Sequence, residues 1–137
     1  PAADGVLYYY AGEAKKQHID YTVRCRLDHL DIADTDLCCL LGNALDNAVT
    51  ACAAYSGPRE IVVASEKSGG ALLLTVDNSF DGTLSLENGV LLSKKRPHSR
   101  GIGIPSMEEI CQKYDGTCRF EGKGSRFEAS FFLRLQE

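Results

Sequence analysis

A long predicted helix without any Lys, Arg or Glu is the feature that most constrains this sequence. Between Arg26 and Arg59 the chain contains no Lys, Arg or Glu, although 25% of its residues are charged. Apolar residues recur at helical spacing from 34 to 54, and Asp34 or Thr35 can cap the helix that this spacing predicts. The apolar positions are Leu37, Leu40, Leu41, Ala44, Leu45, Ala48, Val49 and Cys52. A helix that faces water normally carries charged residues on its outer side, so something other than water must cover part of this one.

A second, polar stripe lies on the same predicted helix. It consists of Asn43, Asp46, Asn47 and Thr50. Their spacing of i, i+3, i+4 and i+7 turns all four in the same direction. Asn costs about 0.7 kcal/mol against Ala inside a helix, so two Asn one turn apart are a poor choice for stability alone. The stripe can hydrogen-bond a neighbouring loop or meet water, but the Asn pair on a helix short of charge favours a ligand. Neutral amide oxygens suit a Mg²⁺ ion that phosphate groups already hold.

The composition is that of one globular domain. The 137 residues include 15 Lys and Arg against 19 Asp and Glu, a net charge of −4, which argues against a general nucleic-acid-binding face. No apolar run is long enough for a membrane helix. The six cysteines lack zinc-ligand spacing, which favours free thiols in a reduced, cytosolic protein. Because the chain begins Pro1-Ala2-Ala3 with neither a helix cap nor a signal pattern, we expect it to be part of a longer protein.

The remaining periodicities predict a mixed sheet with helices on one face. We expect helices over 5–17 and from Pro105 to Gly116, which is placed to end the second of them. Strands are predicted at 19–27, 61–65, 71–76, 117–121 and 126–135. The last two would be joined by a turn at 122–124. Residues 80–100 carry glycines, a proline and a basic run, which is typical of a long functional loop. This order of elements predicts an α+β fold, a two-layer sandwich.

A glycine-rich segment precedes the last predicted helix. Residues 100–104, Arg-Gly-Ile-Gly-Ile, run straight into that helix, so free backbone N–H groups and the positive end of the helix dipole can face phosphate. A pair of glycines alone also fits a tight turn. The basic run at 94–96 alone would be a solvated patch, but beside the glycines it predicts a phosphate contact from Lys94 or Arg100.

The segment LLGNALDNAVTAC, residues 40–52, strongly resembles the N box of the GHKL family of ATP-binding domains, which includes gyrase and sensor histidine kinases. Its form L-G-N-x-L-D-N-A is the one found in histidine kinases of the quorum-sensing, peptide-responsive type. The resemblance implies the Bergerat fold of that family, with ATP and Mg²⁺ as cofactors. It also implies that Asn47 binds Mg²⁺ and that Asn43 stands where the ATPase members carry a general-base Glu.

Three further stretches resemble parts of the nucleotide site of the same family. Residues 92–106 look like its ATP lid and G2 box, with the lid at about 82–100. At residues 76–80 most of the family has the G1 box D-x-G-x-G, whose Asp binds the adenine amino group. This sequence lacks those glycines, so Asn78 is the expected adenine-reading residue and Asp77 the alternative. Near the end, Gly-Ser-Arg-Phe at 124–127 resembles the closing G-T-x-F, where a hydroxyl can lie beside the adenine. The implied nucleotide-binding residues are Asn43, Asn47, Asn78, Asp77, Lys94, Arg100, Gly101, Gly103 and Ser125.

These resemblances imply the catalytic domain of a sensor histidine kinase, which transfers the γ-phosphoryl group of ATP to a histidine on an upstream domain. We expect residues 1–17 to end a linker helix from that dimerisation domain and residues 18–137 to form the ATP-binding domain. The implied partners are the upstream dimerisation and phosphoacceptor helices and, indirectly, a response regulator, with no nucleic acid and no direct membrane contact. The chain would be a cytoplasmic domain of a membrane-anchored sensor.

Two other functions are compatible with the same family. A GHKL-type ATPase or an anti-sigma-like serine kinase would be favoured by a carboxylate at Asn43 and a complete G1 box, neither of which the sequence has. A catalytically inactive, nucleotide-binding scaffold is compatible with the altered G1 box. An amide cannot take a proton from water, so Asn43 favours phosphoryl transfer over hydrolysis. With Asn47 it makes up the expected catalytic pair.

Overall fold

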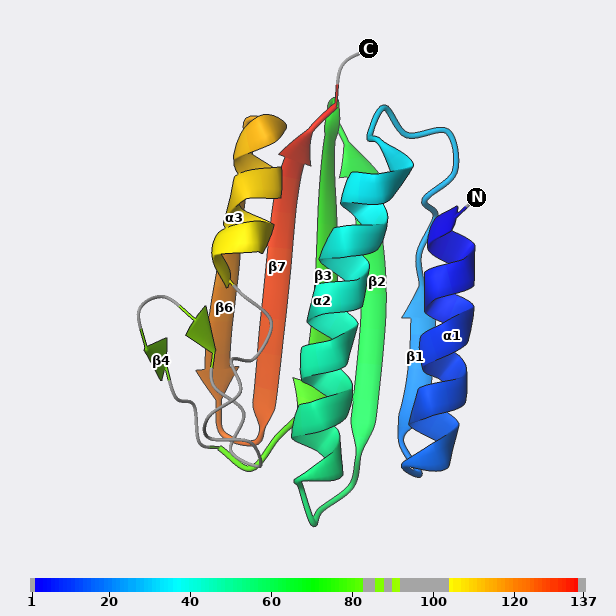
Figure 1. The fold of residues 1–137 in the computed structure, drawn as a ribbon, viewed down its shortest axis with the longest axis vertical. Helices are drawn as coiled ribbons and strands as arrows, with labels where there is room; N and C mark the ends of the chain where they lie inside the picture. The colour runs from blue at the N-terminus through cyan, green and yellow to red at the C-terminus, as the bar shows by residue number, and fades with distance from the viewer. Residues whose placement is uncertain (1, 83–85, 88–89, 92–103, 136–137) are drawn as a thin grey trace.

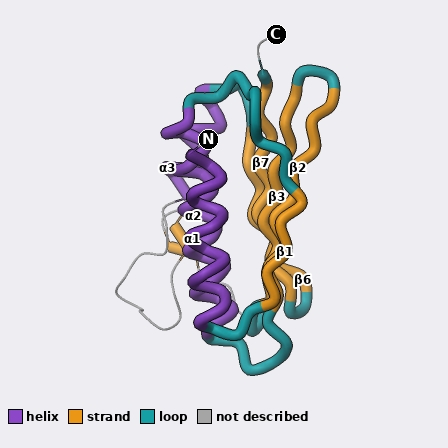
Figure 2. Tube along the Cα trace, turned by 90° about the vertical axis from the view of Figure 1, so that its right-hand side faces the viewer, coloured by secondary structure: helices purple, strands orange, loops and turns teal. Residues whose placement is uncertain are grey.

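In the part of the chain that the structure describes, three helices cover one face of a five-stranded sheet. Figures 1 and 2 show the helix layer and the sheet from two directions. The computed structural model describes residues 2–82, 86–87, 90–91 and 104–135. The helices are α1 (Ala2–Lys16), α2 (Asp34–Ala53) and α3 (Ile104–Lys113). The strands of the sheet are β1 (Asp20–Arg24), β2 (Glu60–Ser68), β3 (Ala71–Ser79), β6 (Thr117–Lys123) and β7 (Arg126–Arg134). The predicted two-layer α+β sandwich is therefore confirmed.

The sheet is mixed, and β3 lies at its centre. The strand order is β1-β2-β3-β7-β6, in which β1 and β2 pair in parallel and the other neighbours pair antiparallel. Because side chains alternate along a strand, Leu72, Leu74 and Val76 of β3 turn toward the helices and are buried. Leu73 between them turns to the other face, where 38% of it is exposed. The core thus lies between the sheet and the helix layer.

Helix α2 runs down the middle of the helix layer, beside α1 and over β3. Its predicted apolar stripe is buried, apart from the half-buried Val49. Helix α1 begins earlier than predicted and packs on α2 and β1 through the buried residues Ala3, Leu7, Tyr10 and Ala14. The Arg59 guanidinium joins the carboxyl ends of the two helices, because it donates hydrogen bonds to the carbonyls of Gln17 at 2.7 Å and Ala53 at 3.0 Å.

The start of α2 differs from the prediction. The N-cap residue is Ala33, and no side chain caps the helix, so the expected cap by Asp34 or Thr35 is wrong. A residue distant in sequence takes this role: the Tyr114 hydroxyl accepts a hydrogen bond from the Ala33 N–H at 3.0 Å and donates one to Asp36 Oδ2 at 2.6 Å. Tertiary packing of the end of α3 against the start of α2 replaces a local cap.

The ends of the closing hairpin are also shifted. The turn lies at residues 124–125 rather than at 122–124, because Gly122 and Lys123 pair with β7 as the last residues of β6. Gly124 has φ +60°, a conformation that glycine adopts without steric cost. Gly116 follows α3 as predicted, but Asp115 takes the left-handed conformation there. Gly116 is needed for space, since a Cβ atom would collide with the Phe132 carbonyl.

The remaining strands differ from the predictions mainly in length. β1 is shorter than the predicted strand at 19–27, whereas β2 and β3 extend beyond 61–65 and 71–76. In the predicted loop at 80–100 the structure contains a two-stranded pair, β4 (Leu86–Glu87) with β5 (Val90–Leu91). The rest of the predicted ATP lid, from residue 83 onward, lies outside the described residues. Within the described part of the chain, no helix is long and apolar enough to span a membrane.

Candidate functional site

The two asparagines of the polar stripe lie on the side of α2 that faces α3. Asn43 and Asn47 are half-buried. They follow Asp36 by seven and eleven residues, about two and three helical turns, so the three residues share one side of the helix. Asp36 itself bonds to Lys113 and Tyr114 at the end of α3. The asparagines therefore face the space between α2 and α3.

Asp46 is separated from the asparagines by its hydrogen bonding. Its carboxylate accepts a hydrogen bond from the Tyr10 hydroxyl of α1 at 2.6 Å. The Asn43 amide nitrogen instead contacts Cys39 Sγ within its own helix, at 3.4 Å, and sulfur is a weak acceptor. The polar stripe of the sequence thus divides in the structure: Asp46 is turned to α1, while Asn43 and Asn47 are turned to α3.

Asn78 lies at the end of β3, on the face of the sheet that the helices cover. Only 2% of it is exposed, and its amide nitrogen donates a hydrogen bond to the Ser79 carbonyl at 3.0 Å. The same carbonyl accepts a hydrogen bond from Cys52 Sγ at 3.4 Å, which places the carboxyl-terminal half of α2 over the end of β3. Asn78 therefore lies beneath the half of α2 that carries Asn47. The nitrogen is held by Ser79, and the amide oxygen is the acceptor atom of this side chain.

Asp77 points to the opposite face of the sheet. There it forms an ion pair with Arg126 of β7. The same guanidinium bonds Glu60 Oε1 and Ser79 Oγ, each at 3.2 Å, so it ties the ends of three strands together. Of the two residues that the sequence left open for reading adenine, only Asn78 faces the space between the sheet and the helices.

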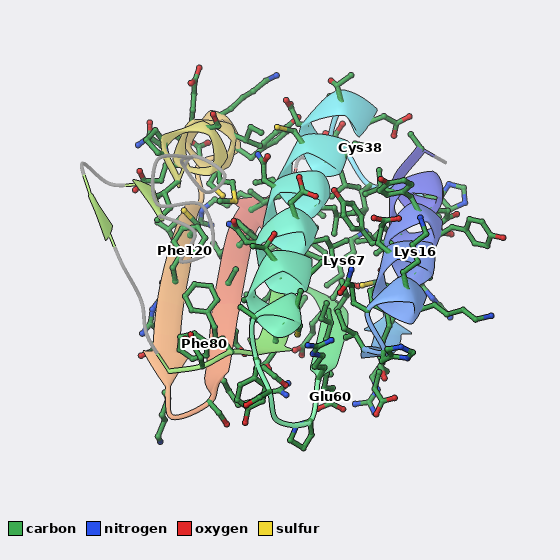
Figure 3. All side chains as sticks on the ribbon, turned by 60° about the horizontal axis from the view of Figure 1, so that its bottom comes forward. Lys16, Cys38, Glu60, Lys67, Phe80 and Phe120 are labelled. Carbon is green, nitrogen blue, oxygen red and sulfur yellow. The ribbon has the colours of Figure 1, made fainter. Side chains whose placement is uncertain are left out.

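Aromatic side chains that the sequence analysis did not single out lie beside Asn78. Phe80 and Phe127 are buried, with ring centroids 5.8 Å apart in an edge-to-face arrangement. Phe120 and Phe131 form a second such pair at 6.0 Å. Figure 3 shows the labelled Phe80 and Phe120 on the same side of α2 as α3. The alternation of side chains along β7 explains this grouping. Because Phe127 and Phe131 are four residues apart in one strand, both turn to the helix face.

The remaining predicted site residues are Ser125 and four residues that lie outside the part of the chain that the structure describes. Ser125 is exposed in the β6–β7 turn, and its carbonyl accepts a hydrogen bond from the Phe80 N–H at 2.9 Å. The turn thereby fixes the start of the segment after β3. Lys94, Arg100, Gly101 and Gly103 lie outside the described residues. Helix α3 begins directly after them, with Pro105 in its first turn as predicted.

The donor set fits a nucleotide and its metal better than a metal bound by protein alone. Among the described residues, no group of three or more His, Cys, Asp or Glu side chains forms a metal site. Mg²⁺ commonly takes one or two protein oxygens and completes its shell with phosphate and water, which suits a single amide such as Asn47. The Asn78 oxygen suits an amino group, and the faces of the neighbouring phenylalanines suit a flat base.

Comparisons with known proteins bear on the family and the fold of this chain. The profile of the GHKL domain matches residues 32–134. The fold is similar to the histidine kinase AdeS of Acinetobacter baumannii, at 16% identity and a TM-score of 0.72, over 98% of this chain and 63% of that one. It is similar to the catalytic domain of histidine kinase ThkA, at 20% identity and a TM-score of 0.73, over 96% and 88%. It is also similar to full-length ShkA, at 15% identity and a TM-score of 0.75, over 97% and 29%.

These matches differ in what they establish. No curated protein matches the sequence. The chain spans less than two thirds of AdeS and of ShkA, so it corresponds to one part of each. At these identities the solved structures establish the shared α+β fold, and the profile match over most of the chain establishes the family. The chain belongs to the GHKL domain family.

Proposed function

We propose that this domain binds Mg²⁺ and ATP and is the catalytic domain of a sensor histidine kinase. The observation that carries the proposal is the buried amide of Asn78, whose orientation is set by the Ser79 carbonyl at 3.0 Å, beneath the half of α2 that bears Asn47. A buried amide held in this way supplies an acceptor on the floor of the space between α2 and α3. An adenine amino group is a donor of matching kind.

Different residues would contact the base, the metal ion and the phosphates of the nucleotide. Asn78 would accept a hydrogen bond from the adenine, with the buried pair Phe80 and Phe127 beside the base. Asn47 would hold the Mg²⁺ ion, which when bound neutralises charge on the phosphates. The backbone N–H groups of Gly101 and Gly103, with Lys94 or Arg100, would contact the phosphates. Phosphoryl transfer depends mainly on such positioning and charge neutralisation.

The acceptor of the phosphoryl group would be a histidine of another domain. Asn43 supports transfer to a protein side chain rather than to water, because an amide cannot serve as a general base. The partners would be upstream dimerisation and phosphoacceptor helices, to which residues 1–17 would lead, and indirectly a response regulator. The solved structure of ThkA in complex with a response regulator protein supports this for a relative of the same fold. The parent protein would be a membrane-anchored, peptide-responsive sensor of the quorum-sensing type.

The decisive experiment incubates the 137-residue chain with γ-labelled ATP and Mg²⁺, alone and with its own upstream helical domain. The chain alone should bind ATP but acquire no label, since the positioned acceptor histidine is absent. Addition of the upstream domain should produce acid-labile label on that domain. Label on the chain alone, or rapid release of phosphate, would contradict the proposal. ATP binding without any transfer would favour the scaffold alternative.

A further inference from the structure

The Tyr10 hydroxyl of α1 contacts α2 at two points. It donates a hydrogen bond to Asp46 Oδ1 at 2.6 Å and lies 3.3 Å from the Gly42 carbonyl oxygen. Tyr10 is buried whereas Asp46 is exposed, so the hydroxyl makes these contacts at the edge of the interface between the two helices. A bond of 2.6 Å between a hydroxyl and a carboxylate is short and charge-assisted. This contact fastens α1 to α2 beside the expected nucleotide site.

The same two contacts involve two residues of the motif to which nucleotide binding gives no role, Asp46 through its side chain and Gly42 through its backbone carbonyl. Gly42 directly precedes Asn43 in the sequence, and Asp46 directly precedes Asn47. Successive helix residues are turned by about 100°, so the two pairs form adjacent stripes on α2. One stripe meets Tyr10, and the other faces the space toward α3. A rigid helix cannot move one stripe without moving the other.

We propose that Asp46 is a positioning residue for Mg²⁺–nucleotide binding, and that it acts through Tyr10 and α1 rather than by contact with the ion. The inference rests on the proposed function, because it concerns the same site. Asp46 directs its carboxylate oxygen at the Tyr10 hydroxyl, and that contact turns the group toward α1. The position of α1 against α2 therefore sets how Asn43 and Asn47 meet a ligand.

A second tyrosine supplies a matched control. The Tyr21 hydroxyl of β1 donates a hydrogen bond to the Leu7 carbonyl of α1 at 3.0 Å, so it fastens the same helix to the sheet without touching α2. Burial raises the pKa of Tyr21 to about 12. Burial first, and then the hydrogen bond to Asp46, raise the pKa of Tyr10 as well. Both hydroxyls thus remain donors at neutral pH.

The test measures the Kd of ATP by calorimetry, with Mg²⁺ and with chelator, well below the unfolding temperature of every variant. Tyr10→Phe and Asp46→Ala should each weaken Mg²⁺–ATP binding about tenfold, the scale seen for partners that orient a metal ligand. Asp46→Asn should stay within about threefold of wild type, because its amide oxygen still accepts the Tyr10 bond. The double variant Tyr10→Phe with Asp46→Ala should be no weaker than either single one. Tyr21→Phe should lower thermal stability and leave the Kd unchanged.

The alternatives produce different patterns. If Asp46 were itself a metal ligand, Asp46→Ala would lose Mg²⁺–ATP affinity while Tyr10→Phe bound normally, and the inference would be overturned. A Tyr10→Phe variant that binds like wild type, or a Tyr21→Phe variant that loses affinity equally, would also overturn it. A wild-type chain that binds no nucleotide at all would instead refute the proposed function.

Discussion

The start and the middle of helix α2 both carry polar residues on one side, but these residues have different partners. At the start of the helix, Asp36 accepts hydrogen bonds from Tyr114 at 2.6 Å and from Lys113 at 2.9 Å. Farther along the same side, the Asn43 amide nitrogen lies 3.4 Å from the thiol sulfur of Cys39, one helical turn back. The Asp36 carboxylate has two strong protein partners, whereas the Asn43 amide meets a weak one.

Under the proposed function, this difference separates residues that maintain the fold from residues placed for a ligand. The contacts of Tyr114 replace the missing side-chain cap of α2 and join it to α3. Asn43 and Asn47 lower helix propensity, and they lie half-buried beside the space above Asn78. Substitutions at the start of α2 should therefore change stability, whereas substitutions at the asparagines should change nucleotide affinity.

Asn47→Ala should have the largest effect. We expect about a 100-fold loss of Mg²⁺-dependent ATP affinity, about 2.7 kcal/mol, because a direct ligand counts at least as much as the groups that orient it. The fold should be intact, since Ala is the better helix former. Calorimetry with and without Mg²⁺ measures the loss, and Thr35→Ala in the first turn of the same helix is the control. Unchanged Mg²⁺–ATP binding would make Asn47 a structural residue.

Tyr114→Phe tests the contacts at the start of α2. It removes the hydroxyl that accepts from the Ala33 N–H and donates to Asp36, so unfolding should become easier by about 1–3 kcal/mol. Urea unfolding measures this change. The ATP affinity of the folded variant should remain within about twofold of wild type. A large loss of affinity would show that the start of α2 and the asparagines are not independent.

Asn78→Leu should reduce ATP affinity about tenfold, the equivalent of one buried hydrogen bond. The substitution should also reduce any preference for ATP over GTP, since guanine carries an acceptor where adenine carries its amino group. Competition binding with the two nucleotides measures both effects. Asp77→Asn on the opposite face of the sheet is the control and should leave the preference unchanged. A preference that follows Asp77 instead would reverse the assignment.

The smallest effect concerns acid stability. The hydrogen bond from Tyr114, followed by that from Lys113, lowers the pKa of Asp36 below its usual range. A carboxyl with a lowered pKa in the folded state stabilises the protein above its unfolded pKa of about 3.9, and this contribution is lost as pH falls through the folded value. Asp36→Asn should therefore be less stable than wild type at pH 7, and the gap should narrow in urea unfolding between about pH 5 and pH 2. A gap independent of pH would contradict this account.

Local patterns predicted the helices well. The predicted helix at 34–54 and the observed α2, Asp34–Ala53, agree within one residue because the apolar period is a property of the segment itself. Strand boundaries were less accurate, since the length of a strand depends on its neighbours. The predicted side-chain cap of α2 was wrong for a similar reason. The Tyr114 hydroxyl, far along the chain, bonds the backbone at the start of the helix in place of Asp34 or Thr35.

The sequence by itself determined the class of fold and the pair Asn43 and Asn47, because helical spacing places residues four apart on one side wherever the helix lies. It favoured Asn78 over Asp77 as the adenine-reading residue, but it could not show which of these strand neighbours faces the helices. Only the pairing of β3 within the sheet decided that Asn78 faces the helices and that Asp77 meets Arg126. It also could not separate Asp46 from the asparagines, because the contact with Tyr10 joins residues that are 36 positions apart. Such choices depend on which elements pack together, and packing is settled only when the whole chain has folded.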